Sequence, residues 1–255
     1  MAVYLGWKVN GESTGAGREV ALLEYIYDRP DLEQLRGNPR KVLDAIDNFA
    51  QTKVGLINVG NSKGGIVCGV MAEHKPSVML ELGGYMGFSA IMFGNALREN
   101  GGSKYYSVEK NPLFAAIAAN LIDLAGLGDV VRVVVGTGAE GIQRLYDEGV
   151  FEGRPIDMAF FDHHKPAYKT DLKLCERLGL IDKGTVLVAD NMIIPGNPAY
   201  AEYVRATVAE KREKDKVAEE KGNANLVYKS RSVNGFEPSG GEDAVEITEC
   251  LGVEA

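Results

Sequence analysis

Residues 77–87 read SVMLELGGYMG, a short apolar run that leads directly into a glycine-rich turn. An apolar run of this length, bounded by glycine, is typical of a buried strand. The glycines allow the backbone to turn tightly and to approach a ligand closely. Because residues 88–98 have a helical pattern, the stretch predicts a strand, a loop and a helix in succession.

This succession repeats towards the C-terminus. Further strand-like runs are residues 104–109, 130–135, 156–161 and 184–189, and further helix-like segments are residues 112–125 and 168–180. Strands that alternate with helices at this spacing predict an α/β fold, with a parallel sheet and helices on both faces. A ligand should then bind beyond the carboxyl ends of the strands.

The flanking regions are less regular. Residues 1–17 are interpreted as a loose arm, and amphipathic helices are expected from residue 18, after residue 39 and over 62–74. Residues 210–221, EKREKDKVAEEK, carry mixed charge and almost no apolar stripe. We interpret this run as a solvated helical face, and a mobile flap near the site is the alternative.

Composition excludes several classes of function. The chain has 255 residues and a formal net charge of −8, which opposes binding to duplex nucleic acid or to an anionic membrane surface. Cys68, Cys175 and Cys250 have no metal-binding spacing, so we expect reduced thiols. No apolar run approaches the ~20 residues of a membrane span, and no secretion signal is evident. We therefore expect a cytoplasmic protein.

Two acids indicate a nucleoside cofactor. Glu81 ends the first strand beside the glycine loop, where it would repel a pyrophosphate and attract a sulfonium or an amino group. This favours S-adenosylmethionine over NAD. Glu109 ends the second strand, about twenty residues beyond the loop, where an acid commonly binds both ribose hydroxyls. The alternative is that Glu109 only caps the helix that follows it.

Polar side chains also follow two later strands. Asp162 ends one apolar run, and Asp190 and Asn191 end the next. Adjacent strand ends lie only about 5 Å apart, so these carboxylates would repel one another without a cation. Their oxygens suit Mg²⁺. A zinc site at His163 and His164 is the weaker alternative, because adjacent residues seldom aim both rings at one ion.

Four segments resemble the catechol O-methyltransferase family, in the same order along the chain. They are NVGNSKG (58–64), LELGGYMGFSA (80–90), DMAFFDHHK (157–165) and KGTVLVADNMIIPG (183–196), within a similarity that covers roughly residues 18–205. The resemblance implies a class I methyltransferase fold: a Rossmann-like, seven-stranded, mostly parallel sheet with one antiparallel strand, here expected at 244–250. It also implies a single domain over 1–255, in which helices within 18–74 cover the site and residues near 206–224 form a charged insertion.

The resemblance assigns roles to individual positions. Asp162, Asp190 and Asn191 match the magnesium ligands, and Lys165 matches the general base. The implied cofactor positions are Ile57, Val59, Glu81, Gly83, Tyr85, Ser89, Glu109, Lys110, Gly138, Ala139, Asp162, His163 and His164. The implied substrate positions are Lys165, Asn191, Pro195 and Glu237, with Asn234 as the alternative to Glu237. Gly55 and His164 replace tryptophans, Lys110 replaces a methionine, and Gly138 and Ala139 replace polar residues.

The function implied is transfer of a methyl group from S-adenosylmethionine to one hydroxyl of a vicinal aromatic diol. Mg²⁺ would chelate the diol, and Lys165, Asp162, Asn191 and Glu237 would form the catalytic set. The expected partner is a small aromatic diol, with no nucleic acid or membrane, and the chain is expected to be a monomer or weak dimer. A methyltransferase for caffeoyl thioesters, an NAD-dependent oxidoreductase and a non-catalytic cofactor-binding paralogue are the alternatives.

Overall fold

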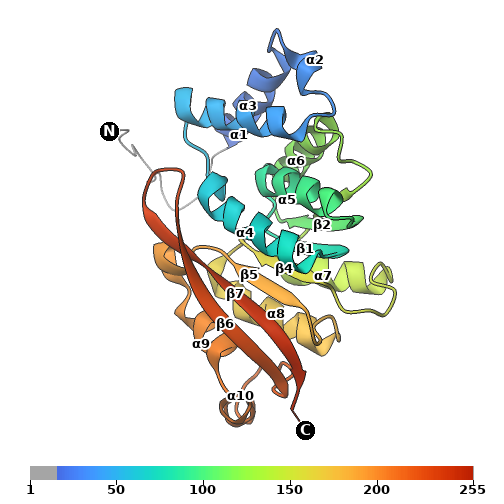
Figure 1. The fold of residues 1–255 in the computed structure, drawn as a ribbon, viewed down its shortest axis with the longest axis vertical. Helices are drawn as coiled ribbons and strands as arrows, with labels where there is room; N and C mark the ends of the chain where they lie inside the picture. Colours follow the sequence, from blue (N-terminus) through green and yellow to red (C-terminus); the bar gives the residue numbers. More distant parts are fainter. Residues whose placement is uncertain (1–15, 255) are drawn as a thin grey trace.

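The computed structural model describes residues 16–254, which contain one seven-stranded sheet (Figure 1). Its strands are β1 (Val78–Leu82), β2 (Lys104–Glu109), β3 (Val131–Val135), β4 (Met158–Phe161), β5 (Val186–Ala189), β6 (Leu226–Phe236) and β7 (Glu242–Val253). The strand order is β3-β2-β1-β4-β5-β7-β6. β1 to β5 pair in parallel, whereas β7 is antiparallel to both of its neighbours. The predicted fold, with one antiparallel strand late in the chain, is confirmed.

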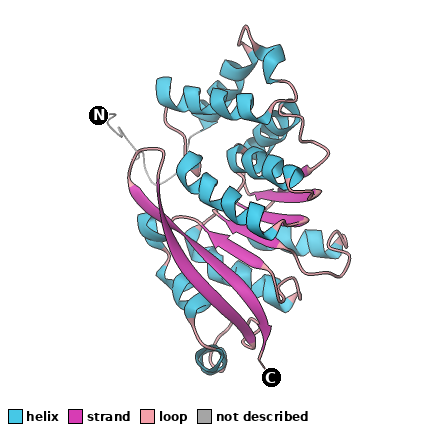
Figure 2. Cartoon of the chain, viewed as in Figure 1, coloured by secondary structure: helices cyan, strands magenta, loops and turns pink. Residues whose placement is uncertain are grey.

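Helices cover both faces of this sheet (Figure 2). They are α1 (Ala16–Tyr27), α2 (Leu32–Leu35), α3 (Pro39–Thr52), α4 (Gly60–His74), α5 (Phe88–Glu99), α6 (Pro112–Leu124), α7 (Gly138–Asp147), α8 (Tyr168–Arg177), α9 (Pro198–Arg205) and α10 (Val208–Asp215). Short turns η1 (Lys165–Ala167) and η2 (Met192–Gly196) follow β4 and β5. The peptide bond between Ile194 and Pro195 is cis.

Alternate residues of each strand enter two different cores, because successive side chains point to opposite faces of a sheet. Met79 and Phe160 pack with α1 and α3 to α6, whereas Leu80 and Phe161 pack with α7, α8 and α9. The central strands are therefore buried on both faces, which explains why their sequences are nearly continuous apolar runs. The polar residues that follow them are carried to one edge of this rigid core.

The charged segment 206–224 lies far from that edge. α10 is tethered where β6 begins, because the buried ammonium of Lys211 donates to the carbonyl oxygen of Leu226. The 11 residues of β6 span ~35 Å before the chain reaches Glu237. In Figure 1 α10 lies at the bottom, beside the C-terminus. No residue of this segment lines the cleft, so the flap interpretation has no support, and only residues 210–215 of the charged run lie in a helix, α10, with Lys211 buried in it.

The three thiols, Cys68, Cys175 and Cys250, are free, as the sequence predicts. Among residues 16–254, no helix is both long enough and apolar enough to cross a membrane.

Candidate active site

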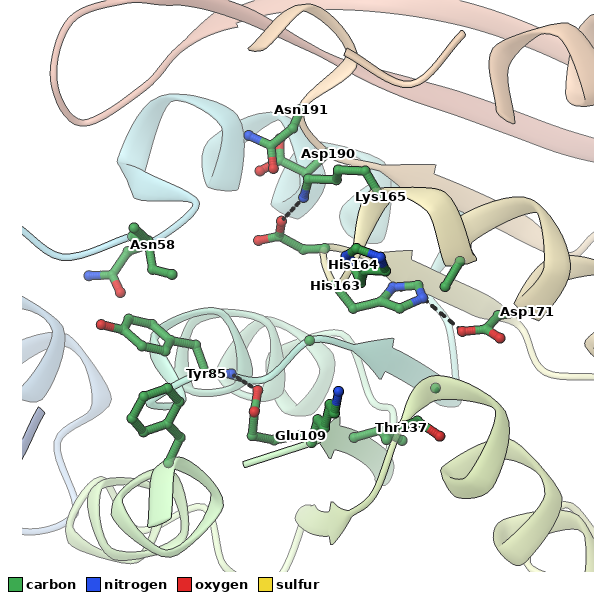
Figure 3. Close-up of a pocket in the computed structure, with 18 of the residues that line it drawn as sticks. Asn58, Tyr85, Glu109, Thr137, His163, His164, Lys165, Asp171, Asp190 and Asn191 are labelled. Atoms are coloured by element: carbon green, nitrogen blue, oxygen red, sulfur yellow. Dashed lines mark hydrogen bonds and ion pairs between the residues drawn. The ribbon is translucent and has the colours of Figure 1, made fainter. Parts of the chain in front are cut away.

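A cleft of about 690 Å³ lies at the carboxyl ends of β1, β2, β4 and β5 (Figure 3). The predicted site residues that line it are Ile57, Gly83, Tyr85, Glu109, Lys110, Gly138, Ala139, Asp162, His163, His164, Lys165, Asp190, Asn191, Pro195 and Glu237. This is the edge at which a parallel sheet binds ligands. Residues predicted from seven separate segments therefore face one cavity.

The glycine loop forms the floor of one end of the cleft. Gly83 has φ of 101°, and a Cβ there would lie 2.4 Å from the carbonyl oxygen of Asp162. Only glycine fits, because this φ lies in the left-handed region and the neighbouring strand end is in contact. The loop thus brings the backbone of β1 directly against the first residue after β4.

Glu109 is fixed beside this loop by backbone donors. Its carboxylate accepts hydrogen bonds from the N–H of Tyr85 at 2.8 Å and of Asn111 at 2.7 Å. Burial raises its pKa above the usual value. Asn111, not Glu109, provides the side-chain cap of α6, since its Oδ1 accepts from Leu113 N. Glu109 therefore lines the cleft, and the capping alternative does not account for its position.

Three predicted cofactor residues lie behind the cleft lining. Val59, Glu81 and Ser89 are buried. Glu81 is completely enclosed and accepts a hydrogen bond from Ser107 Oγ at 2.5 Å. Burial raises the pKa of Glu81 to about 7. Glu81 therefore does not contact a ligand in the cleft directly, because the glycine loop lies between them.

Lys165 stands beside the carboxylate of Asp162. Its Nζ donates to Asp162 Oδ1 at 2.9 Å and to the hydroxyl of Tyr168 at 2.8 Å. Asp162 follows Phe161 and Asp190 follows Ala189, and these strand residues are register partners in β4 and β5. Burial, and then the charge of Asp162, raise the pKa of Asp190 to about 7. The two strand ends therefore bring acids together at an electrostatic cost.

A buried lysine, which the sequence analysis missed, joins this group. Lys63 of α4 is inaccessible to solvent, and its Nζ donates to Asp190 Oδ2, Glu237 Oε1 and Asp243 Oδ2 at 2.9, 2.6 and 2.7 Å. Burial opposes its charge, but Asp190 and the other carboxylates raise its pKa above the usual value. The sequence offered no signal for Lys63 beyond its place in the segment 58–64, because its partners are remote along the chain.

Asn191 is oriented by two of the same carboxylates. Its Nδ2 donates to Glu237 Oε1 at 2.9 Å and to Asp243 Oδ2 at 3.1 Å. Asp243 also accepts from the N–H groups of Ile193 and Ile194, and so it holds the η2 turn. Asp243 is completely buried and was also missed by the sequence analysis. Glu237 lines the cleft, whereas the alternative Asn234 is exposed on β6.

The two histidines do not converge. His163 Nε2 is hydrogen-bonded to Asp171 Oδ2 at 2.8 Å, and its ring stacks on Tyr168 at 4.9 Å. His164 is exposed at the cleft (Figure 3). Within residues 16–254 no group of three or more His, Cys, Asp or Glu side chains has the arrangement of a metal site. The zinc alternative has no support in this geometry.

Comparisons with known proteins agree with the fold. A family described as a methyltransferase domain matches residues 80–192. Catechol O-methyltransferase of Mus musculus is 36% identical over 211 residues, which cover 80% of this chain and 77% of the mouse protein. A probable O-methyltransferase of Mycobacterium tuberculosis is 37% identical over 194 residues, covering 75% of this chain and 80% of that protein.

Solved structures share the architecture. The O-methyltransferase from Bacillus cereus, in complex with SAH, superposes with a TM-score of 0.58 at 18% identity. The match covers 91% of this chain and 96% of the bacterial one.

Proposed function

The chain belongs to the catechol O-methyltransferase family and is an S-adenosylmethionine-dependent O-methyltransferase, and we propose that it methylates one hydroxyl of a vicinal aromatic diol with the help of Mg²⁺. Membership of this family is incompatible with the NAD-dependent alternative. The observation that carries the proposal is the joint presence of Asp162, Asp190, Asn191 and Lys165 in one cleft with the cofactor loop.

The donor set fits a hard divalent cation. Asn191 directs its amide nitrogen at Glu237 and Asp243, which leaves its carbonyl oxygen available as a ligand. Asp190 Oδ1 is buried 2.8 Å from Lys63 Nζ but accepts no aligned hydrogen bond. With Asp162, these groups offer the oxygen ligands that Mg²⁺ prefers. This chemistry supports the proposed assignment of Asp162, Asp190 and Asn191 as Mg²⁺ ligands.

The charge balance points the same way. The site holds two amines, those of Lys63 and Lys165. They contact or neighbour four carboxylates, those of Asp162, Asp190, Glu237 and Asp243. When every group is ionised, two negative charges remain, because four minus two leaves two. A divalent cation compensates this excess and offsets the cost of burying the acids.

When bound, Mg²⁺ would supply Lewis acidity that favours ionisation of a diol hydroxyl. Once Lys165 has released its own proton to solvent, its amine accepts the proton released by that hydroxyl, and Glu237 accepts a hydrogen bond from the second hydroxyl. The phenolate oxygen then forms a bond to the methyl carbon as the bond between that carbon and the sulfonium sulfur breaks. The products are the methyl ether and S-adenosylhomocysteine. The chain contributes mainly by holding the reactants in line.

Methyl transfer from labelled S-adenosylmethionine tests the proposal on three substrates in Mg²⁺: catechol, resorcinol and phenol. We expect product from catechol only, because adjacent hydroxyls are needed for chelation. Equal turnover of resorcinol, whose hydroxyls are not adjacent, would contradict the proposal. Turnover of a caffeoyl thioester without turnover of free catechols would favour the thioester alternative, and no turnover of any diol would favour the non-catalytic one.

A further inference from the structure

One wall of the cleft consists of residues 136–139 and the side chain of Asp171. Gly136 and Gly138 have no side chain, and Ala139 offers only a methyl group. Thr137 Oγ1 is committed to the start of α7, since it donates to Glu140 Oε2 at 2.9 Å and accepts from Glu140 N at 3.3 Å. Asp171 is therefore the acidic side chain that this wall presents to a ligand.

The carboxylate of Asp171 is held in place. The residue is only 5% exposed, and its Oδ2 is hydrogen-bonded to His163 Nε2 at 2.8 Å. The His163 ring is itself fixed by stacking on Tyr168. Asp171 Oδ1 accepts no hydrogen bond from residues 16–254, although the residue lines the cleft. One oxygen is thus anchored, and the other is available as an acceptor.

Gly138 provides the space that this carboxylate needs. A Cβ at position 138 would lie 2.0 Å from Asp171 Oδ2 and 3.3 Å from His163 Nε2. Any larger residue would therefore displace Asp171. The N–H groups of Gly138 and Ala139 precede the first intrahelical bond of α7, which Gly141 donates to Thr137. The wall combines a charged acceptor with backbone donors.

The position of the wall identifies the part of the cofactor that it meets. In α/β nucleoside sites the acid at the end of the second strand binds the ribose, and here that acid is Glu109. β3 pairs with β2 on the side away from β1, so the loop of residues 136–139, which follows β3, lies next beyond Glu109 at this edge of the sheet, and we place the base against it. Adenine carries an exocyclic amino group, a donor, beside a ring nitrogen that accepts.

We propose that Asp171 accepts a hydrogen bond from the exocyclic amino group of the cofactor's adenine and gives the site its selectivity for that base. The inference rests on the proposed function only in requiring that the adenosyl cofactor bind in this cleft. Gly138 and His163 act as positioning residues, since they keep the carboxylate in reach. In hypoxanthine a carbonyl oxygen replaces the amino group, so two acceptors would face each other and one buried group would lose its partner.

Calorimetric binding of S-adenosylhomocysteine and S-inosylhomocysteine tests the inference, because the two ligands differ only in the exocyclic group, an amino group in one and a carbonyl oxygen in the other, and in the adjacent N1, which carries a proton in hypoxanthine. We expect the wild type to bind the adenosyl ligand at least about tenfold more tightly, the difference of a hydrogen bond to a charged acceptor. Asp171→Asn can donate to the hypoxanthine carbonyl, so the ratio of the two Kd values should fall to about one.

Gly138→Ala is a second variant, which displaces the carboxylate without changing the charge and should lower the same ratio severalfold. Asp147→Asn, on the exposed end of α7 and outside the cleft lining, is the control and should keep the wild-type ratio. A merely structural role for Asp171 would weaken both ligands equally.

A ratio that stays at the wild-type value in Asp171→Asn, while the folded variant still binds both ligands, would overturn the role of Asp171 alone. Failure of the wild type to bind either ligand would overturn the cofactor assignment, and the inference with it.

Discussion

Lys165 is the residue on which the proposed proton transfer depends. It lies in the cleft at the end of β4, with its Nζ 2.9 Å from Asp162 Oδ1. The sequence predicted Asp162, Asp190 and Asn191 because they lie within two residues of the end of an apolar strand, whereas Lys165 was indicated by the family resemblance. It could not predict Lys63 or Asp243, whose contacts exist only in the folded chain.

Lys165→Met should lower kcat by about 10² to 10⁴, the usual contribution of a positioned base, and should leave the Kd for the cofactor within twofold. Steady-state kinetics with catechol and calorimetry with S-adenosylhomocysteine measure the two effects. Lys169→Met, on α8, is the matched control. A kcat within twofold of the wild type would remove Lys165 from the role of base.

Glu81 should make stability depend on pH. Burial raises its pKa from an ordinary 4.5 to about 7, so the protonated acid favours the folded state. This contribution is fully present below about pH 4.5 and is lost as the pH rises through about 7. Glu81→Gln removes this contribution. The free energy of unfolding of the variant, relative to that of the wild type, should therefore rise by on the order of 3 kcal/mol between pH 4.5 and 8. Urea unfolding of both proteins across this range measures the gain, and parallel pH curves would contradict the assignment.

At the scale of elements, the sequence predicted those whose local pattern is strong. The run 104–109 is β2, the last four residues of the run 184–189 are β5, and the run 112–125 contains α6. α7 was not predicted, because its glycines at 138 and 141 weaken the helical pattern. β6 was also missed, since it alternates polar residues along an edge strand whose pairing depends on β7. The burial of Lys211 in α10 could not be predicted, because its neighbours in the sequence are also charged.

Lys211 anchors α10 and should matter for stability only. Its Nζ lies 4.4 Å from the centre of the Tyr228 ring and donates to the Leu226 carbonyl. Lys211→Met should lower the free energy of unfolding by about 1 to 3 kcal/mol through loss of this hydrogen bond and cation–π contact. Because residues 206–224 do not line the cleft, kcat/KM should stay unchanged. Lys216→Met, at an exposed lysine, is the control, and an altered kcat/KM in a stable Lys211 variant would contradict this account.

At the scale of the whole molecule, the site is completed by parts that are far apart in sequence. Lys63 and Asp243 are separated by 180 positions, yet their side chains meet at 2.7 Å. This contact requires that β7 pair with β5 (Figure 1). The turn between β6 and β7 also brings Glu237 into the cleft lining. No local pattern encodes such a closure, which explains why only the resemblance indicated Glu237.

The mouth of the cleft should admit bulky diols. Gly55 is exposed with open space around it, and Ile57, two residues further along the chain, lines the cleft and is 58% exposed. We expect kcat/KM for a flavonoid with adjacent hydroxyls to equal or exceed that for catechol. Gly55→Trp should lower the value for the flavonoid about tenfold or more and leave that for catechol nearly unchanged. A strong preference of the wild type for catechol would contradict an open mouth.

The central claim is that a divalent cation, held by Asp162, Asp190 and Asn191, is required for methyl transfer to a diol. The most direct measurement is methylation of catechol with Mg²⁺ and again with excess chelator, for the wild type and for Asp190→Ala, with cofactor binding measured in parallel. We predict that chelation abolishes product from the wild type. Asp190→Ala should form none under either condition while still binding S-adenosylhomocysteine. Undiminished turnover after removal of the metal, or full turnover by Asp190→Ala, would contradict the account.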